Sequence, residues 1–282
     1  MLFRECANPV VSGIPDFGHP PLYFRMPLHG DLFDRCVVND WLDTFDRYFQ
    51  IAPAHSPADV MKALALRYQV YCIEHPFEDS ERYRDGYERD EFDRRSVHSI
   101  LTHRTTGDAA ATVRLVLSDR NRPDQMFPIE KHCPLDHRLW NDALRQFKRS
   151  EIAEISRFAV SKQFRRRLGE PQTTHGVVNP FPSENVNQER RVLPQITLGL
   201  FQAIVRMSRD HEIRLWVAVM EPTLLRLLRR FGIYFTPIGE PVEYHGLRIP
   251  CVGPVDDVMD GIRRNFPEVF QFITCESGLW PY

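Results

Sequence analysis

The sequence predicts a mixed α/β fold in which helices flank a central sheet. Residues 96–104 and 109–117 are two strand-like runs separated by a turn that contains Gly107, which indicates an antiparallel hairpin. Between residues 194 and 249, a helix, a strand, a second helix and a strand with a hairpin follow one another. With 43% hydrophobic residues, the 282-residue chain can bury a sizeable core.

A helix is predicted from Pro57 to about residue 74. Ser56 suits the N-cap, Pro57 suits the first helical position, and an acidic residue follows in the first turn. The stripe of residues that recurs at helical spacing on its apolar face contains a charge, Arg67. Short helices are further indicated within 136–149 and from Pro222 to just before Gly232.

The first 50 residues predict an N-terminal arm with a helical extension. Residues 1–30 are rich in Gly and Pro, and apolar residues in 31–52 fit one helical face. Residues 51–282 are expected to form the main domain. Residues 168–192, which are polar and rich in Pro, Asn and Ser, predict a flexible loop inside that domain.

Composition argues against several classes of protein. The formal net charge of -2 disfavours a general nucleic-acid binder, and no run of about 18 apolar residues predicts a membrane helix. Six scattered cysteines and the absence of a signal-like N-terminus favour reduced thiols in the cytoplasm. His132, Cys133 and His137 fit no recurrent zinc spacing, so no metal is predicted.

Charged residues interrupt several apolar runs. In EISRFAV, residues 154–160, Glu154 and Arg157 stand within a predicted buried strand, and Arg114 stands within the second hairpin strand. Burying an unpaired charge costs roughly several kcal/mol, so each of these charged residues must pair with another group or take part in chemistry. Residues three apart face opposite sides of a strand unless a bulge intervenes. Glu154 and Arg157 are therefore expected to have separate partners.

The loop over residues 75–95 is predicted to lie outside the core because it is densely charged. Within it, Glu88, Asp90 and Asp93 alternate with aromatic residues that can anchor the loop while the acids turn inward. Three guanidinium groups and these carboxylates together predict a polar network.

Four of these runs carry a family resemblance. RYQVY, YERDEFD, TVRLV and EISRF, in this order from Arg67 to Val160, resemble the signature of acyl-homoserine lactone autoinducer synthases. The chain resembles more closely the long-chain N-acyl amino acid synthases of the PEP-CTERM/exosortase-associated branch. The resemblance implies a GNAT-like acyltransferase fold, with a mixed and mostly antiparallel central sheet flanked by helices.

The resemblance also implies roles for individual residues. Glu154 corresponds to the catalytic position. Tyr71 and Phe77 stand where the autoinducer synthases more often carry phenylalanine and tryptophan. Scaffolding remains the alternative to substrate contact for Arg67 and Arg114. The substrate-binding positions implied are Arg67, Tyr71, Phe77, Glu88, Asp90, Asp93, Arg114, Arg157 and Phe158.

The implied reaction is transfer of a long-chain acyl group from a thioester to an amine. Glu154 would take the amine proton, directly or through water. Asp90 and Asp93 would hold the acceptor's ammonium group, while the arginines lock these acids or bind an acceptor carboxylate. No tightly bound cofactor is expected. Aromatic residues that could line an acyl tunnel are Phe147, Phe158, Phe164, Phe201 and Trp216.

The implied donor is acyl-phosphopantetheine, carried by acyl carrier protein or by coenzyme A. The chain lacks a glycine-rich loop of the kind that holds pyrophosphate at a helix start. A basic run suits an acidic carrier protein instead, or is a solvated surface: Lys162, Arg165, Arg166 and Arg167. The alternative functions are a lactone synthase that uses S-adenosylmethionine and a non-catalytic module that binds carrier protein.

Overall fold

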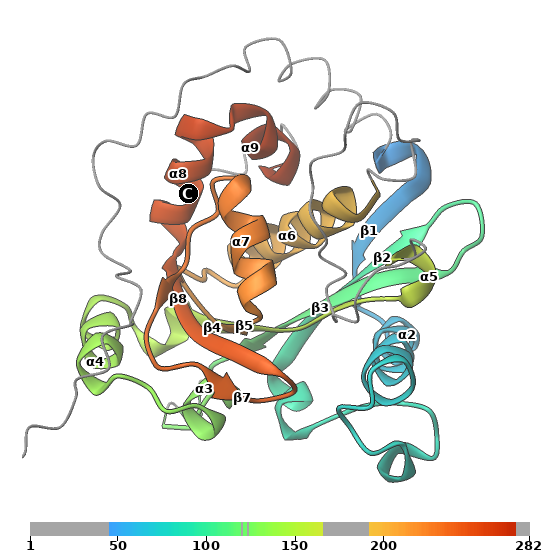
Figure 1. Cartoon of the computed structure of the whole chain (residues 1–282), viewed down its shortest axis with the longest axis horizontal. Coiled ribbons are helices and arrows are strands. Elements are labelled where there is room, and N and C mark those ends of the chain that lie inside the picture. Colours follow the sequence, from blue (N-terminus) through green and yellow to red (C-terminus); the bar gives the residue numbers. More distant parts are fainter. Residues whose placement is uncertain (1–44, 120, 123, 166–191, 275–282) are drawn as a thin grey trace, which may run out of the picture.

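A computed structural model describes residues 45–119, 121–122, 124–165 and 192–274 (Figure 1). The predicted arm over residues 1–44 and nearly all of the predicted polar loop lie outside the described residues. No helix in the described ranges is long and apolar enough to cross a membrane.

An eight-stranded sheet runs through the centre of the molecule in the order β1-β2-β3-β4-β5-β8-β6, and β7 pairs with β8. Only the β4–β5 pair is parallel, and the other pairs are antiparallel. The expected mixed, mostly antiparallel sheet is therefore confirmed. The strands are β1 Phe49–Pro53, β2 Ser96–His103, β3 Ala109–Leu117, β4 Ile152–Val160, β5 Leu215–Met220, β6 Thr236–Pro237, β7 Val242–Glu243 and β8 Leu247–Pro254.

Helices cover both faces of this sheet. Figure 1 shows α6, α7, α8 and α9 on one side and α2, α3 and α4 on the other. The helices are α2 Pro57–Tyr68, α3 Pro128–His132, α4 His137–Gln146, α5 Lys162–Arg165, α6 Val192–Asp210, α7 Pro222–Arg230, α8 Val255–Asn265 and α9 Pro267–Thr274. A π-helical turn at Gln69–Glu74 continues α2, and 3-10 turns lie at Ser80–Tyr83, Glu91–Arg95 and Arg149–Glu151.

The start of α2 forms as its sequence predicts. The Ser56 hydroxyl accepts a hydrogen bond of 3.1 Å from the Asp59 N–H, and Pro57 occupies the first turn. The π-helical turn that continues α2 ends at Glu74, where the predicted helix also ends. Widening of the helix by one residue per turn is often found at functional sites. Arg67 lies in the last turn of α2, just before this change.

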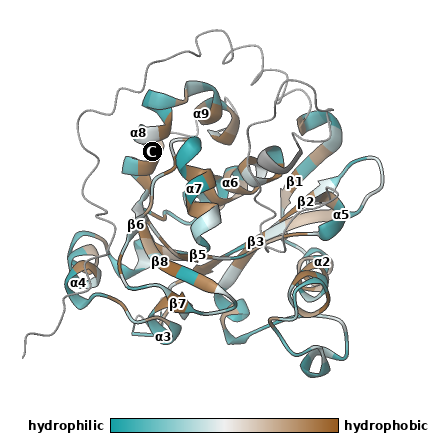
Figure 2. Cartoon of the chain, viewed as in Figure 1, coloured by the Kyte–Doolittle hydropathy of each residue, from teal (hydrophilic) through white to brown (hydrophobic). Residues whose placement is uncertain are grey.

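The two faces of the sheet bury separate apolar clusters. Figure 2 shows hydrophobic residues gathered on the strands and on the helix faces that turn toward them. Ala153 and Ile155 of β4 belong to the larger cluster, which α6 to α9 cover. Ile152 belongs to the cluster on the opposite face, with Phe127 and Trp140. A strand buried on both faces explains why β4 reads as a nearly continuous apolar run.

A β-bulge interrupts β4 at Arg157. Arg114 of β3 pairs with Ser156, but Thr112, two residues earlier, pairs with Ala159, three residues later. Arg157 adopts a left-handed backbone conformation with φ of 49°. This conformation is costly for a residue other than glycine, and such strain concentrates at functional sites. The bulge turns Arg157 to the face of Glu154 and Ser156, as contacts described below show.

Two sequence interpretations need correction. Helical spacing was expected to continue to residue 52, but Phe49–Pro53 form strand β1, which pairs with β2. The predicted boundary at residue 50 thus falls inside a strand. The loop over residues 75–95 was expected to lie outside the core, yet Glu88 is fully buried and Phe92 is 6% exposed. Guanidinium groups neutralise the buried acids of this loop, a pairing that polarity alone does not reveal.

Candidate active site

The central parallel strands separate and open a pocket between them. Their ladder ends at the pair Ile155–Ala218, although β4 continues to Val160 and β5 to Met220. A pocket that opens to solvent lies in this gap. Its walls come from β4, β5, α6, α7 and the β7–β8 hairpin. The lining residues are Tyr71, Pro128, Glu154, Ile155, Ser156, Arg157, Phe158, Phe201, Ile204, Ala218, Val219, Met220, Leu224, Leu228, Phe235, Tyr244, His245 and Arg248.

Glu154 lines this pocket and is 2% exposed. Its Oε2 accepts a hydrogen bond of 2.8 Å from the backbone N–H of Ile129, in the first turn of α3. Burial raises the pKa of the Glu154 carboxyl to about 8, although this hydrogen bond and Arg114 act in the opposite direction. A carboxyl with a pKa in this range can exchange protons near neutral pH, as a general base requires.

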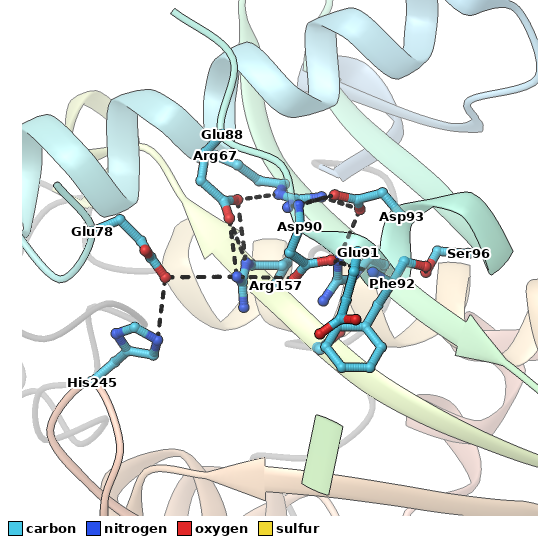
Figure 3. A network of polar contacts seen from close by, with 12 residues as sticks. Arg67, Glu78, Glu88, Asp90, Glu91, Phe92, Asp93, Ser96, Arg157 and His245 are labelled. Atoms are coloured by element: carbon cyan, nitrogen blue, oxygen red, sulfur yellow. Dashed lines mark hydrogen bonds and ion pairs between the residues drawn. The ribbon is translucent and has the colours of Figure 1, made fainter. Parts of the chain in front are cut away.

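A buried network of ions lies beside the pocket, as Figure 3 shows. Arg67 of α2 donates from Nη1 to Oδ1 of Asp93 at 2.6 Å and from Nη2 to Oδ2 at 3.1 Å, a two-pronged contact. Its Nε donates to Glu88. Both Arg67 and Glu88 are fully buried. The charge on the apolar face of α2 is therefore matched by the acidic loop.

Arg114 and Arg157 join the same network from the sheet. Nη1 of Arg114 donates to Asp90 at 2.6 Å and to Asp93 at 2.8 Å, and its Nε donates to the Ser156 hydroxyl at 3.0 Å. Nη2 of Arg157 donates to Glu88 at 3.0 Å and to Asp90 at 3.2 Å. Glu154 and Arg157 thus have separate partners, as the spacing predicted.

The acids of the network stay ionised because they face guanidinium groups. Burial alone would raise the pKa of Glu88, but the charges of Arg157 and Arg67 hold it well below its usual range. Arg67 and Arg114 have the same effect on Asp93, and Arg114 lowers the pKa of Asp90. Three guanidinium groups face Glu88, Asp90 and Asp93 here, and Nη2 of Arg157 also lies 3.9 Å from Oε1 of Glu78. Glu154 makes no ion pair within the described residues, and its pKa is far higher than those of the network acids.

The predicted site residues divide into two groups. Glu154, Tyr71, Arg157 and Phe158 line the pocket. The Tyr71 hydroxyl lies 3.5 Å from the Phe158 carbonyl, at hydrogen-bond distance. The remaining predicted residues are not among the lining side chains. They are Arg67, Phe77, Glu88, Asp90, Asp93 and Arg114.

Other predictions concern the aromatic residues and the basic run. Phe201 lines the pocket, whereas Trp216 is buried in the larger cluster. Phe164 packs against that same cluster, and Phe147 packs against the cluster on the opposite face. Lys162 is exposed at the start of α5. The Arg165 side chain, together with Arg166 and Arg167, lies outside the described part of the chain. The docking role of the basic run stays a prediction.

Three lining residues of the β7–β8 hairpin escaped sequence reasoning: Tyr244, His245 and Arg248. Nε2 of His245 lies 3.4 Å from Oε1 of Glu78, a contact drawn in Figure 3. Burial, then the charges of Arg157 and Arg248, lower the pKa of His245 to about 4. One signal was available, because Arg248 stands between Leu247 and Ile249 in a predicted strand, as Arg114 does in its own.

Comparisons with known proteins find similarity to acyltransferases. Residues 66–173 match the profile of the acetyltransferase (GNAT) domain. The acyl-homoserine-lactone synthase of Vibrio anguillarum is 24% identical over 206 residues, which cover 71% of this chain and 84% of that protein.

Solved structures with similar folds include two bacterial synthases. FeeM, an N-acyl amino acid synthase from uncultured soil microbes, has a TM-score of 0.48 at 13% identity, covering 77% of this chain and 96% of FeeM. The AHL synthase LasI has a TM-score of 0.44 at 16% identity, covering 72% of this chain and 87% of LasI. Residues 66–173 are thus similar to the acetyltransferase (GNAT) domain, and the chain as a whole is similar to an acyl-homoserine-lactone synthase.

Proposed function

We propose that the protein is an N-acyltransferase, which moves a long-chain acyl group from the thioester of acyl carrier protein to the amine of an amino acid or a related small molecule. One observation carries the proposal: Glu154, a buried carboxyl whose pKa is raised to about 8, lines a pocket between diverging strands of a GNAT domain. Amide formation needs a base beside an apolar acyl site, and this pocket offers both.

In the proposed reaction the acceptor binds as an ammonium ion, and Glu154 takes one proton, directly or through water. The neutral amine then attacks the thioester carbonyl, the C–N bond forms, and collapse of the tetrahedral intermediate breaks the C–S bond. The nitrogen loses its second proton, and the departing phosphopantetheine thiolate takes up one proton to leave as the thiol. Cys133 lies near Glu154, but burial raises the pKa of its thiol to about 12. Direct attack by the amine is thus favoured over an acyl-cysteine intermediate.

The acyl chain is proposed to occupy the apolar part of the pocket. Phe201 and Ile204 of α6 and Leu224 and Leu228 of α7 line it, with Phe235 beyond α7. Burying each methylene of an acyl chain against such side chains contributes about 0.8 kcal/mol, so the wall favours long chains. Exposed Lys162 and the basic residues after it are proposed to dock the acidic carrier protein.

The ion network is proposed to position the acceptor end of the site. Arg114 holds Ser156 and Asp90, and Arg157 of the bulge contacts Asp90 and Glu88. Charged groups fixed this way need no rearrangement during the reaction. On this view, Asp90, whose side chain is 22% exposed, is the network acid best placed to attract an ammonium ion. A cytoplasmic location and an association with exosortase systems stay predictions from the sequence.

The test compares lipid extracts from bacteria that express the wild type or the Glu154→Gln variant, using high-resolution mass spectrometry. An N-acyl amino acid found only with the wild type would support the proposal and name both substrates. A lactone together with methylthioadenosine would point instead to the chemistry that the name of the Vibrio anguillarum relative describes. Identical extracts from two soluble, folded proteins that bind carrier protein would favour the non-catalytic module.

A further inference from the structure

The hydrogen bond that Glu154 accepts joins two separate elements of the chain. Its donor, the Ile129 N–H, belongs to α3, and its acceptor belongs to β4, 25 residues later. Helix α3 has only five residues, and a helix this short is not stable by itself. The place of the Ile129 N–H therefore depends on the contacts that other segments make with the start of α3.

Arg149 makes such contacts on both sides of Ile129. Its Nη2 donates to the Gln125 carbonyl at 3.0 Å, and its Nη1 donates to Oε1 of Glu130 at 3.1 Å. Nη2 also donates to the other oxygen of Glu130, which makes the ion pair two-pronged. The Arg149 and Glu130 side chains are 17% and 15% exposed, so little water screens this pair. Arg149 therefore holds the segment that contains Ile129.

The same arginine stands directly before the strand of Glu154. The 3-10 turn Arg149–Glu151 begins with it, and β4 follows this turn without a gap. Arg149 thus connects the strand that carries the carboxyl to the helix that carries its donor. A shift of α3 relative to β4 would have to stretch the pair of Arg149 with Glu130 as well as the hydrogen bond to Glu154.

Phe127, the N-cap residue of α3, is held by the same group of side chains. Its ring is fully buried, and the guanidinium carbon of Arg149 lies 4.3 Å from the ring centroid. The Phe127 N–H donates to Oε2 of Glu130 at 2.7 Å. Arg95 adds a second guanidinium group 5.2 Å from the ring centroid, and its Nη2 donates to the Met126 carbonyl at 2.5 Å. Two arginines and one glutamate therefore fix the residues that lead into α3.

The charges that act on Glu154 come from several elements. Arg114 of β3 and Arg157 of β4 lower the pKa of its carboxyl, as the Ile129 hydrogen bond does, and Glu130 of α3 raises it. Within the described residues, the Ile129 N–H is the one donor that bonds to this carboxyl, so its position directly affects the proton affinity. The other titratable groups that interact electrostatically with Glu154 are Arg95, Cys133 and Tyr244.

We propose that Arg149, together with Arg95 and Glu130, positions the Ile129 N–H for the general base of the reaction. Arg149 does not line the pocket and acts on Glu154 through α3, so it is a positioning residue. Without its two-pronged contact, the N–H moves away from the carboxylate and stabilises the ionised form less. This inference rests on the proposed function and adds the residues that set how readily Glu154 takes a proton.

The experiment follows the Glu154 carboxyl itself, so its result does not depend on the identity of the substrates. Full-length protein, isotope-labelled at the side-chain carboxyl carbon of glutamate, is titrated by NMR from about pH 5 to about pH 10. The Glu154 signal is the one that Glu154→Gln lacks. The variants are Arg149→Met, which removes the charge, and Arg149→Lys, which keeps the charge but loses the two-pronged contact. Arg145→Met is the control, because the Arg145 side chain is 78% exposed and pairs with Asp142 in α4.

Arg149→Met is expected to raise the midpoint of the Glu154 titration by about one pH unit, and Arg149→Lys by less, because a weaker hydrogen bond favours the carboxylate less. The pH at which kcat/KM rises should move by the same amount, with an unchanged KM for the acyl donor. A wild-type midpoint in folded Arg149→Lys protein would overturn the positioning role, because only the two-pronged contact is lost there. An equal rise in Arg145→Met would overturn it as well. Wild-type protein that acylates no amine would instead overturn the proposed function, and the titration midpoints would decide separately whether Arg149 positions Glu154.

Discussion

The backbone N–H of Ile129 donates a hydrogen bond of 2.8 Å to Oε2 of Glu154. Ile129 lies in the first turn of α3, where backbone N–H groups have no partner within the helix. The helix start thus holds the carboxyl in place without the full countercharge of an arginine. Burial without an arginine ion pair in the described residues separates Glu154 from the acids of the ion network, which guanidinium groups hold ionised.

The first prediction concerns the pH dependence of the reaction. If Glu154 is the base, kcat/KM should rise with pH up to about 8, the value to which burial raises its pKa, in addition to the ionisation of the acceptor amine. Glu154→Gln should lower kcat by about 100-fold or more and remove the titration near pH 8. Steady-state assays from pH 6 to 9 measure both effects.

The matched control for this experiment is Glu91→Gln, because the Glu91 side chain is 60% exposed and pairs with Lys131 at the surface. This variant should keep the wild-type profile. A Glu154→Gln protein with full activity, or one with the same pH profile as the wild type, would exclude Glu154 as the base.

The second prediction concerns stability. The pKa of Glu154 is raised on folding from 4.5 to about 8, so the folded state binds the proton more tightly. The contribution of the Glu154 carboxyl to the free energy of unfolding is fully present below pH 4.5 and is lost as the pH rises through 8. Glutamine keeps an acceptor for the Ile129 N–H but cannot ionise. Glu154→Gln should therefore be more stable than the wild type at pH 9. The gain in unfolding free energy should be a few kcal/mol, because each pKa unit corresponds to about 1.4 kcal/mol, and it should be smaller at pH 6.

Urea unfolding at both pH values measures this difference. A Glu154→Gln protein whose stability follows that of the wild type at every pH would show that the carboxyl does not carry the proposed shift.

The third prediction concerns Glu88, whose pKa lies far below its usual value. A lowered pKa gives stability the opposite dependence on pH from that of Glu154. The stabilisation by Glu88 is present above pH 4.5 and is lost as the pH falls below that value. Glu88→Gln removes the fully buried carboxylate that Arg67 and Arg157 share, and leaves Arg67 with Asp93 and Arg157 with Asp90. This change should cost about 3–5 kcal/mol of unfolding free energy at pH 7, and less at pH 3.

Chemical denaturation at pH 7 and pH 3 checks this result, with Glu81→Gln as the control because its side chain is 75% exposed. A loss of stability at pH 7 in Glu88→Gln no larger than in Glu81→Gln would contradict a structural role for the network.

The sequence allows much of this site to be predicted because buried charges are rare. Arg67, Arg114 and Glu154 each interrupt an apolar pattern, and their burial is confirmed. The sequence indicated only that a bulge would be needed for Glu154 and Arg157 to share a face. It did not predict the bulge itself, because arginine rarely adopts a left-handed backbone. The hairpin wall was missed because Tyr244 and His245 are ordinary turn-flanking residues. Only tertiary contacts bring them to the pocket.

Helices α8 and α9 were also not predicted. Phe266 follows the polar run Arg263, Arg264 and Asn265, and Pro254, the N-cap of α8, provides no side-chain cap. Their apolar faces are evident only from tertiary packing. The residues of α8 and α9 that join the large cluster are Val258, Met259, Ile262 and Val269. Tertiary burial, rather than local capping, stabilises this pair of helices.

The last prediction concerns acyl-chain length. Phe201 is 2% exposed, lines the pocket from α6, and meets Trp216 edge to face with ring centroids 5.4 Å apart. Leucine is shorter than phenylalanine, so Phe201→Leu should lengthen the apolar space at a cost of about 1 kcal/mol in stability. The preferred acyl chain should then grow by one or two methylenes, each worth about 1–3 kcal/mol in discrimination.

The control for this prediction is Phe270→Leu, which makes the same chemical change in α9. Phe270 packs against the same core cluster as Phe201 but does not line the pocket. Competition among carrier-protein thioesters of graded length, read by mass spectrometry, gives the preference of each variant. A longer preferred chain in Phe201→Leu alone would place the acyl chain along α6. Equal shifts of the preferred chain length in both variants would show that a loosened core causes the change. An unchanged preference in both variants would show that the acyl chain lies along another wall of the pocket.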